Sequence, residues 1–384
     1  MFRWSLLILL ALALLVTVPC PAPSCSLCGG GYLNRPSFRE EAAQSSARLI
    51  LFGTFTKSEP GTAPGTGKTT MRLDAVLRSD AWLQDKKVVE LPRYQPVDAK
   101  NPPKFLVFCD IYKGQIDPYR GIPIKSAESV EYVKKAIALD PKNHAVNLEF
   151  FFHYLEHPDK EIAADAFLEF AKASDKDIGE VAAKLAPDKL RGWLKNPQTP
   201  VERLGVYAFL LGACGGKQDG AFLESLLKDR SERTLTAYDG ILSGYMRLEP
   251  KKGWELAATA LKDGKEKLPV RLAVVRAVRF HLNWRPKENR DNVLRCLEAM
   301  ITQGELADVA VEELRRLQIW DLTREVLALY GKKGFDAPIV QRTILRYALC
   351  CKEDAAVRQF LAERRRTEPD LIKEVEESLA AEKK

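Results

Sequence analysis

The chain of 384 residues carries a formal net charge of +7, with 46% hydrophobic and 29% charged residues. This composition allows full hydrophobic cores, and the length predicts two domains of ~100–200 residues each. The positive charge is small and spread along the sequence. Its one compact basic cluster, residues 364–366, is flanked by Glu363 and Glu368. That pattern is typical of a solvated helix face, so we expect no nucleic-acid partner.

The first residues predict export. Arg3 precedes a run of 13 residues, 6–18, which is apolar except for Thr17. The run is shorter than the about 20 residues of a spanning helix and suits a secretory signal. Small residues at positions 22–24 place the expected cleavage before Cys25, so residues 1–24 form the predicted signal peptide. The alternative is an uncleaved N-terminal membrane anchor; in both cases the body of the protein is expected to be periplasmic or secreted.

Export changes the expectation for the cysteines, because oxidising compartments permit disulfides. Four cysteines lie within an apolar helical pattern, where buried free thiols are expected: Cys214, Cys296, Cys350 and Cys351. Cys25 and Cys28 stand outside that pattern, in a predicted linker over residues 25–45. We therefore expect a structural disulfide that involves Cys25, Cys28 or Cys109.

Residues 46–125 carry the pattern of β-strands. The segment 69–77 alternates, with Met71, Leu73 and Ala75 on one face and charged residues on the other. Further β-rich segments are expected over residues 47–56, 87–91 and 104–111, separated by proline-bearing turns. Four or five short strands with no helix between them predict a small barrel or sandwich.

This β-domain resembles the netrin-like, inhibitor-of-metalloprotease type of OB-fold in the order of its parts. Those parts are Cys25 and Cys28, then ARLILFGTF, TTMRLDAVLRSD and FLVFC. The resemblance implies an OB-like barrel. In the inhibitors the mature N-terminal cysteine chelates a protease zinc through a Cys-x-Cys start, whereas the spacing here is Cys-x-x-Cys. Protease inhibition by the β-domain is one alternative function.

Residues 126–384 follow a helical period. Pro200, Pro269 and Pro338 open three similar apolar segments at intervals of 69 residues, and proline favours the first turn of a helix. The second helices of successive hairpins are expected to begin near Asp159, Pro200, Arg233, Pro269, Ala307 and Pro338. This organisation resembles HEAT-type repeats, in which helix pairs bury their apolar faces against neighbouring pairs.

The chain as a whole is similar to exported, largely uncharacterised bacterial proteins that join a small β-domain to HEAT-like repeats. The stretch LPRYQPVDAKNPPKFLVFCDIYKGQIDPYRGIPI, residues 91–124, carries this similarity. The expected fold class is therefore α+β and multidomain, with a small all-β OB-like barrel followed by an all-α HEAT-like solenoid. The similarity implies no known activity.

One motif would carry chemistry. His153, Glu156 and His157 match H-x-x-E-H, the inverted zinc-peptidase pattern. On a helix the two histidines share a face and can hold one zinc, while the glutamate activates the metal-bound water. The resemblance to insulinase-type peptidases implies a third ligand, for which Glu232 lies at a suitable distance along the chain. The structural alternative is a helix over residues 144–157 whose histidines are solvated at its C-terminal end.

Arginines recur on the expected second helices. They are Arg203, Arg233, Arg271, Arg276, Arg279, Arg315, Arg342 and Arg346. Together they could form a basic stripe for an acidic partner, with Arg203, Arg271, Arg276, Arg342 and Arg346 as its candidate residues. The alternative, which we favour, is pairing between repeats with Glu202, Asp239, Glu312 and Glu313.

These observations predict an exported, non-enzymatic scaffold that recognises a protein partner through its helical surface. We expect no cofactor and no resident metal, and a membrane contact only through an uncleaved N-terminus. The enzymatic alternative is a zinc-dependent hydrolase built on residues 153–157 and Glu232.

Overall fold

The computed structural model describes residues 27, 35–63, 66–124, 126–351 and 354–382. It is an α+β protein whose contacts divide it into two compact units, here called the first unit (Ser24–Asp219) and the second unit (Gly220–Lys384). The predicted signal peptide, Cys25 and Cys28 lie outside the described residues. Among the helices that are described, none combines the length and the hydropathy needed to span a membrane.

The first unit contains a five-stranded antiparallel sheet. Its strands are β1 (Leu49–Pro60), β2 (Gly67–Arg78), β3 (Val88–Leu91), β4 (Lys104–Tyr112) and β5 (Gln115–Pro123). Their order is β3-β2-β1-β4-β5. The outer strands β3 and β5 are not hydrogen-bonded to each other, so the sheet is not closed and the predicted barrel is not confirmed. β3 is only four residues long and offers few pairing groups, and Pro118 removes one N–H from β5.

The sheet forms because alternate side chains of its strands meet on one face. Leu49, Leu51, Met71 and Val107 point into a shared apolar core. Gly53 lies at a register shift between β1 and β2, where an added Cβ would approach the Arg72 carbonyl oxygen to 2.1 Å. A glycine is therefore needed where the two strands approach this closely.

Four of the expected strands are confirmed, because their alternation is a local property of the sequence. β1, β2, β3 and β4 occupy the segments predicted near residues 47–56, 69–77, 87–91 and 104–111. The position of β5 was not predicted, since Pro118 and Gly121 interrupt its pattern. The predicted linker over residues 25–45 carries helix α1 (Phe38–Ala43), which short-range periodicity does not reveal.

Seven helices lie wholly within the described part of the first unit. They are α1, α2 (Ala127–Ile137), α3 (His144–Phe152), α4 (Lys160–Lys172), α5 (Asp175–Ala182), α6 (Pro187–Lys195) and α7 (Val201–Cys214). Helix α8 (Lys217–Lys228) crosses the boundary between the units along the chain. Consecutive hairpins pack through contacts of α3 with α4 and α5, and of α7 with α5 and α6.

A buried polar cluster holds α1 against α2 and α4. The backbone N–H of Phe38 donates to Asp165 Oδ1 at 2.7 Å, and the Tyr132 hydroxyl donates to Oδ2 at 2.7 Å. Ser37 Oγ and Arg39 Nη2 donate to Glu169 at 2.5 and 2.6 Å. Burial raises the pKa of Asp165 to about 7, although the hydrogen bonds from Tyr132 and the Phe38 N–H oppose this change.

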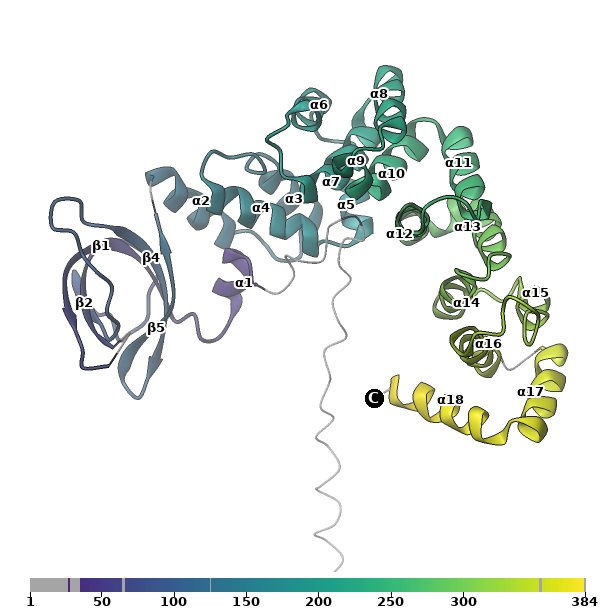
Figure 1. Ribbon diagram of the computed structural model, residues 1–384. Helices are drawn as coiled ribbons and strands as arrows, with labels where there is room; N and C mark the ends of the chain where they lie inside the picture. The colour runs from purple at the N-terminus through teal and green to yellow at the C-terminus, as the bar shows by residue number, and fades with distance from the viewer. Residues whose placement is uncertain (1–26, 28–34, 64–65, 125, 352–353, 383–384) are drawn as a thin grey trace, which may run out of the picture. The chain divides into compact units, whose positions relative to one another are not determined.

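The second unit is entirely helical in its described residues. Its helices are α9 (Glu232–Thr236), α10 (Tyr238–Leu248), α11 (Pro250–Lys262), α12 (Leu268–Trp284), α13 (Pro286–Ile301), α14 (Ala307–Arg316), α15 (Thr323–Leu327), α16 (Pro338–Cys350), α17 (Ala355–Thr367) and α18 (Pro369–Glu382). Figure 1 shows α12, α14, α16 and α18 on one side of this unit and α11, α13, α15 and α17 on the other. We call the first set the even layer and the second set the odd layer.

The helix starts agree with the proline pattern. Asp159 is the N-cap of α4, Pro200 precedes α7, and Pro338 is the first residue of α16. Pro269 lies in the first turn of α12, and α14 begins at Ala307. Proline fits these places because the first backbone N–H groups of a helix have no partner within the helix.

Candidate functional site

The H-x-x-E-H residues do not share a helix face. Helix α3 ends at Phe152, His153 is its C-cap, and Glu156 and His157 lie in the turn that follows, so the helix predicted to continue through residue 157 was wrong. Pro158 disfavours helical geometry at the residue before it, and Asp159 already caps the next helix. The chain must therefore turn between these two points.

Glu156 and His157 are engaged in contacts within the first unit. Glu156 Oε1 accepts hydrogen bonds from Arg203 Nη1 at 3.0 Å and from the Tyr207 hydroxyl at 2.6 Å. His157 Nδ1 accepts from the Asp159 N–H at 3.1 Å, and its Nε2 lies 3.3 Å from Glu128. Burial and the Glu156 charge raise the pKa of Tyr207. These contacts give Glu156 a structural role in joining the end of α3 to α7.

The implied third ligand, Glu232, lies in the second unit, where it is the first residue of α9. Within the described part of the chain, no group of three or more His, Cys, Asp or Glu residues has a geometry that could hold a metal ion.

Among the described residues Cys109 has no disulfide partner, and the other two cysteines of the predicted disulfide, Cys25 and Cys28, lie outside them. Cys109 is a free thiol on β4, fully buried in the core of the sheet. Burial, aided by the negative charge of Asp117, raises its pKa to about 12. Its neighbours in the core are apolar side chains such as Leu49 and Ile116, so it packs as a small hydrophobic residue.

The candidate arginines pair with carboxylates of neighbouring segments. Arg276 Nε lies 2.5 Å from Asp239 Oδ2 of α10, and Arg342 Nε lies 2.9 Å from Glu374 Oε1 of α18. Arg271 forms an ion pair with Glu305. Further pairs join Arg203 to Glu156, Arg279 to Glu313, and Arg346 to Glu312 and Glu382. Pairing between repeats is thus confirmed for Asp239, Glu312 and Glu313.

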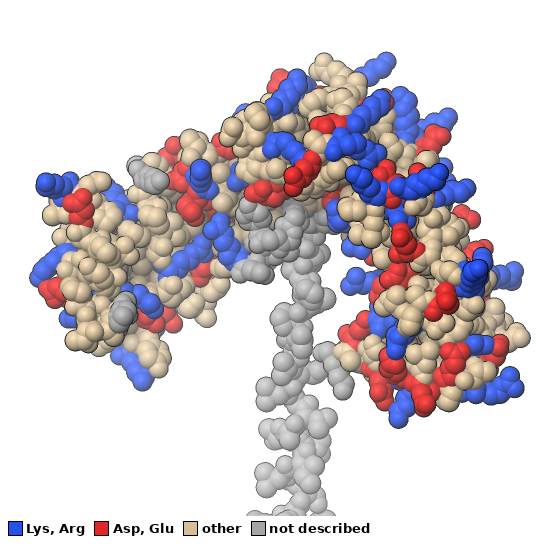
Figure 2. All heavy atoms as spheres, viewed as in Figure 1, with Lys and Arg blue, Asp and Glu red and all other residues tan. Residues whose placement is uncertain are grey.

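The pairs follow an order that was not predicted. Most of the ion pairs in this series join carboxylates of α10, α14 and α18 to arginines of α12 and α16, while Arg315 of α14 also pairs with Glu382 of α18. Each junction between consecutive helices of this series therefore brings opposite charges together. On the face of the second unit seen in Figure 2, acidic and basic side chains are intermingled. Negative and positive side chains therefore alternate along the even layer, and they do not form a continuous basic stripe.

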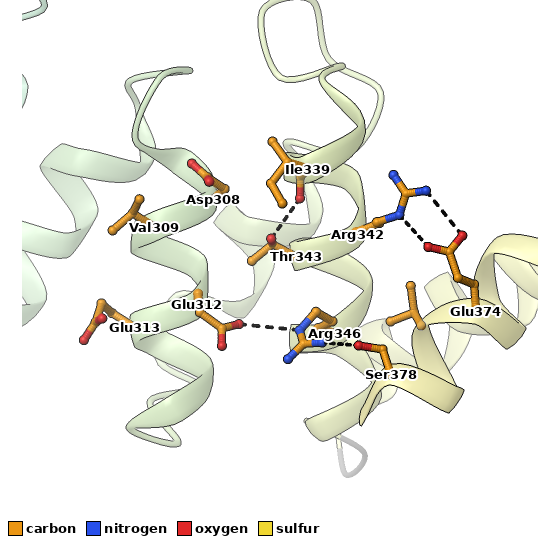
Figure 3. Close-up of a pocket in the computed structure, with 11 residues that line it drawn as sticks. Asp308, Val309, Glu312, Glu313, Ile339, Arg342, Thr343, Arg346, Glu374 and Ser378 are labelled. Carbon is orange, nitrogen blue, oxygen red and sulfur yellow. Dashed lines mark hydrogen bonds and ion pairs between the residues drawn. The ribbon is translucent and has the colours of Figure 1, made fainter. Parts of the chain in front are cut away.

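A groove of about 430 Å³ lies across three helices of the even layer. Figure 3 shows it between α14, α16 and α18. Its lining residues are Asp308, Val309, Glu312, Glu313, Ile339, Arg342, Thr343, Arg346, Glu374, Val375 and Ser378. Thr343 and Val375 are buried at its base, while Ile339 and Ser378 are exposed.

Arg346 occupies a central position in the groove. Its Nη1 donates to Ser378 Oγ at 2.8 Å, and its Nε lies 3.7 Å from Glu312 Oε2. Arg315 also holds Glu312, at 2.6 Å. The Glu312 pKa is therefore lowered, because the two arginines outweigh the effect of burial, which raises it. These contacts link α14, α16 and α18 across the groove.

Sequence reasoning identified the arginines of this groove and missed Glu374, Ser378 and Asp308. A signal for the first two exists, because Arg342 and Glu374, and likewise Arg346 and Ser378, are separated by 32 residues. The pairs Arg279–Glu313 and Arg276–Asp239 have similar separations of 34 and 37 residues. A separation close to one helical hairpin identifies residues that can meet across adjacent helices.

Comparisons with family models, with curated proteins and with solved structures give no match for this chain. The groove and the chemistry of its lining residues are the features of this chain that point to a function.

Proposed function

We propose that this protein is an exported protein–protein interaction scaffold and that the groove of the second unit binds a segment of a partner protein. The observation that carries the proposal is a groove of about 430 Å³ lined by three consecutive even-layer helices. Binding sites in proteins typically have volumes of roughly 300–1,000 Å³ and combine apolar walls with a few fixed polar groups. Ile339, Val309 and Val375 supply the apolar part of this site.

The fixed charges favour binding by a preformed surface. Arg342 and Arg346 are already held by Glu374, Ser378 and Glu312, so these long side chains lose little freedom when a partner arrives. Ordering a flexible side chain at an interface costs ~0.5–1.5 kcal/mol, and preorganisation avoids that cost. No reacting group is required for such a role.

We extend the proposal to the finer description of the fold. The helical region is HEAT-like, supported by its two helix layers and by helix starts that recur along the chain. The β-region is OB-like, supported by its strand order: pairing of β3 with β5 would give every strand two neighbours and would complete a five-stranded barrel. These two strands already contact each other through some of their residues.

The place of action is the periplasm or the exterior of the cell. This part of the proposal is supported by Arg3 and the apolar run over residues 6–18, which have the composition and length of a secretory signal. A scaffold exported in this way would meet envelope or secreted proteins.

The proposal is tested by site-specific photocrosslinking in cells that produce the protein. A photoreactive residue replaces Ser378 in the groove or, as a control, exposed Asp291 on α13 of the odd layer. We expect position 378 to capture a discrete protein that position 291 does not capture, and mass spectrometry identifies it. Equal capture from both positions, or none from position 378, contradicts the proposed function.

A further inference from the structure

The charges that line the groove are almost entirely neutralised within the chain. The lining contains four carboxylates and two arginines. Glu312 is held by Arg315 and Arg346, and Glu374 pairs with Arg342. Glu313 pairs with Arg279, which lies outside the lining. The fourth carboxylate, Asp308, has no hydrogen bond or ion pair with any residue that the structure describes.

Asp308 is half-buried in the first turn of α14. A carboxylate there interacts favourably with the positive end of the helix dipole. The surrounding lining supplies no cation for it, because Arg342 and Arg346 are committed to Glu374, Glu312 and Ser378. A negative charge that is partly removed from water and lacks a counter-ion favours a cationic group from outside the chain.

An exposed aliphatic side chain lies beside this charge. Ile339 is 58% exposed although it is a large hydrophobic residue, and it occupies the first turn of α16. Figure 3 shows Asp308 and Ile339 at the same end of the groove. Val309, also in the lining, extends the apolar wall on α14. One end of the groove therefore offers a negative charge next to an aliphatic surface.

From this arrangement we propose that the groove selects a partner segment with a lysine or arginine side chain beside an aliphatic one. The cation pairs with the Asp308 carboxylate, and the aliphatic side chain covers Ile339. The inference rests on the proposed function and defines its ligand class. It also reverses the sign expected from the arginines alone, which predicted an acidic partner.

The test uses the full exported chain and three blocked pentapeptides, Gly-Leu-Lys-Leu-Gly and its versions with Gln or Glu at the centre. Isoleucine methyl NMR follows each titration through the signal of Ile339. An exposed ion pair contributes up to ~1 kcal/mol, which corresponds to about five-fold in Kd. We expect the lysine peptide to bind about five-fold more tightly than the glutamine peptide, and the glutamate peptide to bind most weakly.

Matched substitutions assign the effect to the groove. Asp308→Asn removes the charge at nearly constant shape and is expected to abolish the preference for lysine. Asp291→Asn, the same change on the odd layer, is expected to retain it. Ile339→Ser is expected to weaken all three peptides, whereas Val146→Ser, at a residue of the first unit that is 57% exposed, is expected to have no effect.

Three results overturn the inference. They are equal affinity for the lysine and glutamine peptides, an unchanged preference in Asp308→Asn, and the absence of any shift of the Ile339 methyl. Each of them leaves the proposed function standing if position 378 still captures a discrete protein, so the two claims fail separately. High salt provides a further check, because the preference is expected to shrink as the ion pair is screened.

Discussion

Replacement of Asp165 by asparagine is expected to change how the stability of the first unit depends on pH. The Asp165 carboxyl is buried and accepts hydrogen bonds from the Phe38 N–H and the Tyr132 hydroxyl. Burial raises its pKa from 3.8 to about 7, Glu169 adds to this rise, and the positive charge of Arg120 opposes it. Asparagine has almost the same shape and cannot ionise.

The magnitude follows from proton linkage. In the unfolded chain an aspartate has a pKa of about 3.9, so between pH ~4 and ~7 the folded state binds more protons at this site than the unfolded state does. The free energy of unfolding contributed by Asp165 therefore falls as pH rises through this window and is constant above it. A difference of about three in pKa corresponds to about 4 kcal/mol. Between pH 4 and pH 8, the free energy of unfolding of Asp165→Asn is therefore expected to rise by about this much relative to that of the wild type.

The assay must report on the first unit alone. Unfolding in urea at each pH, followed by a deuterium pulse at one fixed pH, gives the folded fraction of residues 127–172 by mass spectrometry. Asp85→Asn serves as the control, because Asp85 is exposed and the substitution removes the same charge. If the free energies of unfolding of the wild type and Asp165→Asn changed in parallel between pH 4 and pH 8, the burial of this carboxyl and the docking of α1 would be refuted.

Two other predictions concern packing and thiol reactivity. Gly253→Ala is expected to destabilise the second unit by ~1–3 kcal/mol, because the added Cβ would lie 2.7 Å from the Met246 Cα. At Gly192 on α6 an added Cβ meets no atom within 4 Å, so Gly192→Ala is expected to stabilise the first unit by ~0.5–1 kcal/mol. Thermal unfolding of the two variants checks both signs, and a stable Gly253→Ala protein contradicts the close packing of α10 and α11. Cys350 is exposed and is expected to react with a thiol reagent in the native protein, whereas Cys109, whose pKa burial raises to about 12, is expected to react only after unfolding. Rapid labelling of native Cys109 would argue against its place in the core.

Local patterns predicted much of the fold. The alternation in residues 69–77 predicts β2, and the prolines at 200, 269 and 338 predict the starts of three helices. These signals succeed because each depends on a few neighbouring residues: a pleat exposes alternate side chains, and a helix start tolerates a missing N–H.

The errors occurred where tertiary contacts outweigh local pattern. Helix α1 has only six residues, and the contacts of Ser37 and Phe38 with α4, about 130 residues away, fix its position. Beyond the end of α3, Glu156 is bonded to Arg203 and Tyr207, contacts that a spacing motif does not contain. Closure of the sheet depends on pairing between β3 and β5, which the alternation within each strand does not specify.

The candidate site was predictable only in part. The arginines recur with the repeat, and partners of Arg342 and Arg346 lie 32 residues away, so the ion pairs could be inferred from spacing. The unpaired charge of Asp308 and the exposure of Ile339 could not be inferred from the sequence, because both depend on which side chains pack around them in the folded chain.

Partner binding in the groove is tested by the affinity of the protein captured from position 378 for a chain whose groove is filled by a larger side chain. Val309→Trp places a large side chain in the lining, and Val146→Trp places the same residue on an exposed surface of the first unit. We expect Val309→Trp to weaken binding at least ten-fold, which corresponds to about 1.4 kcal/mol, and Val146→Trp to leave the affinity unchanged. Equal affinities for the wild type and Val309→Trp would contradict binding in the groove.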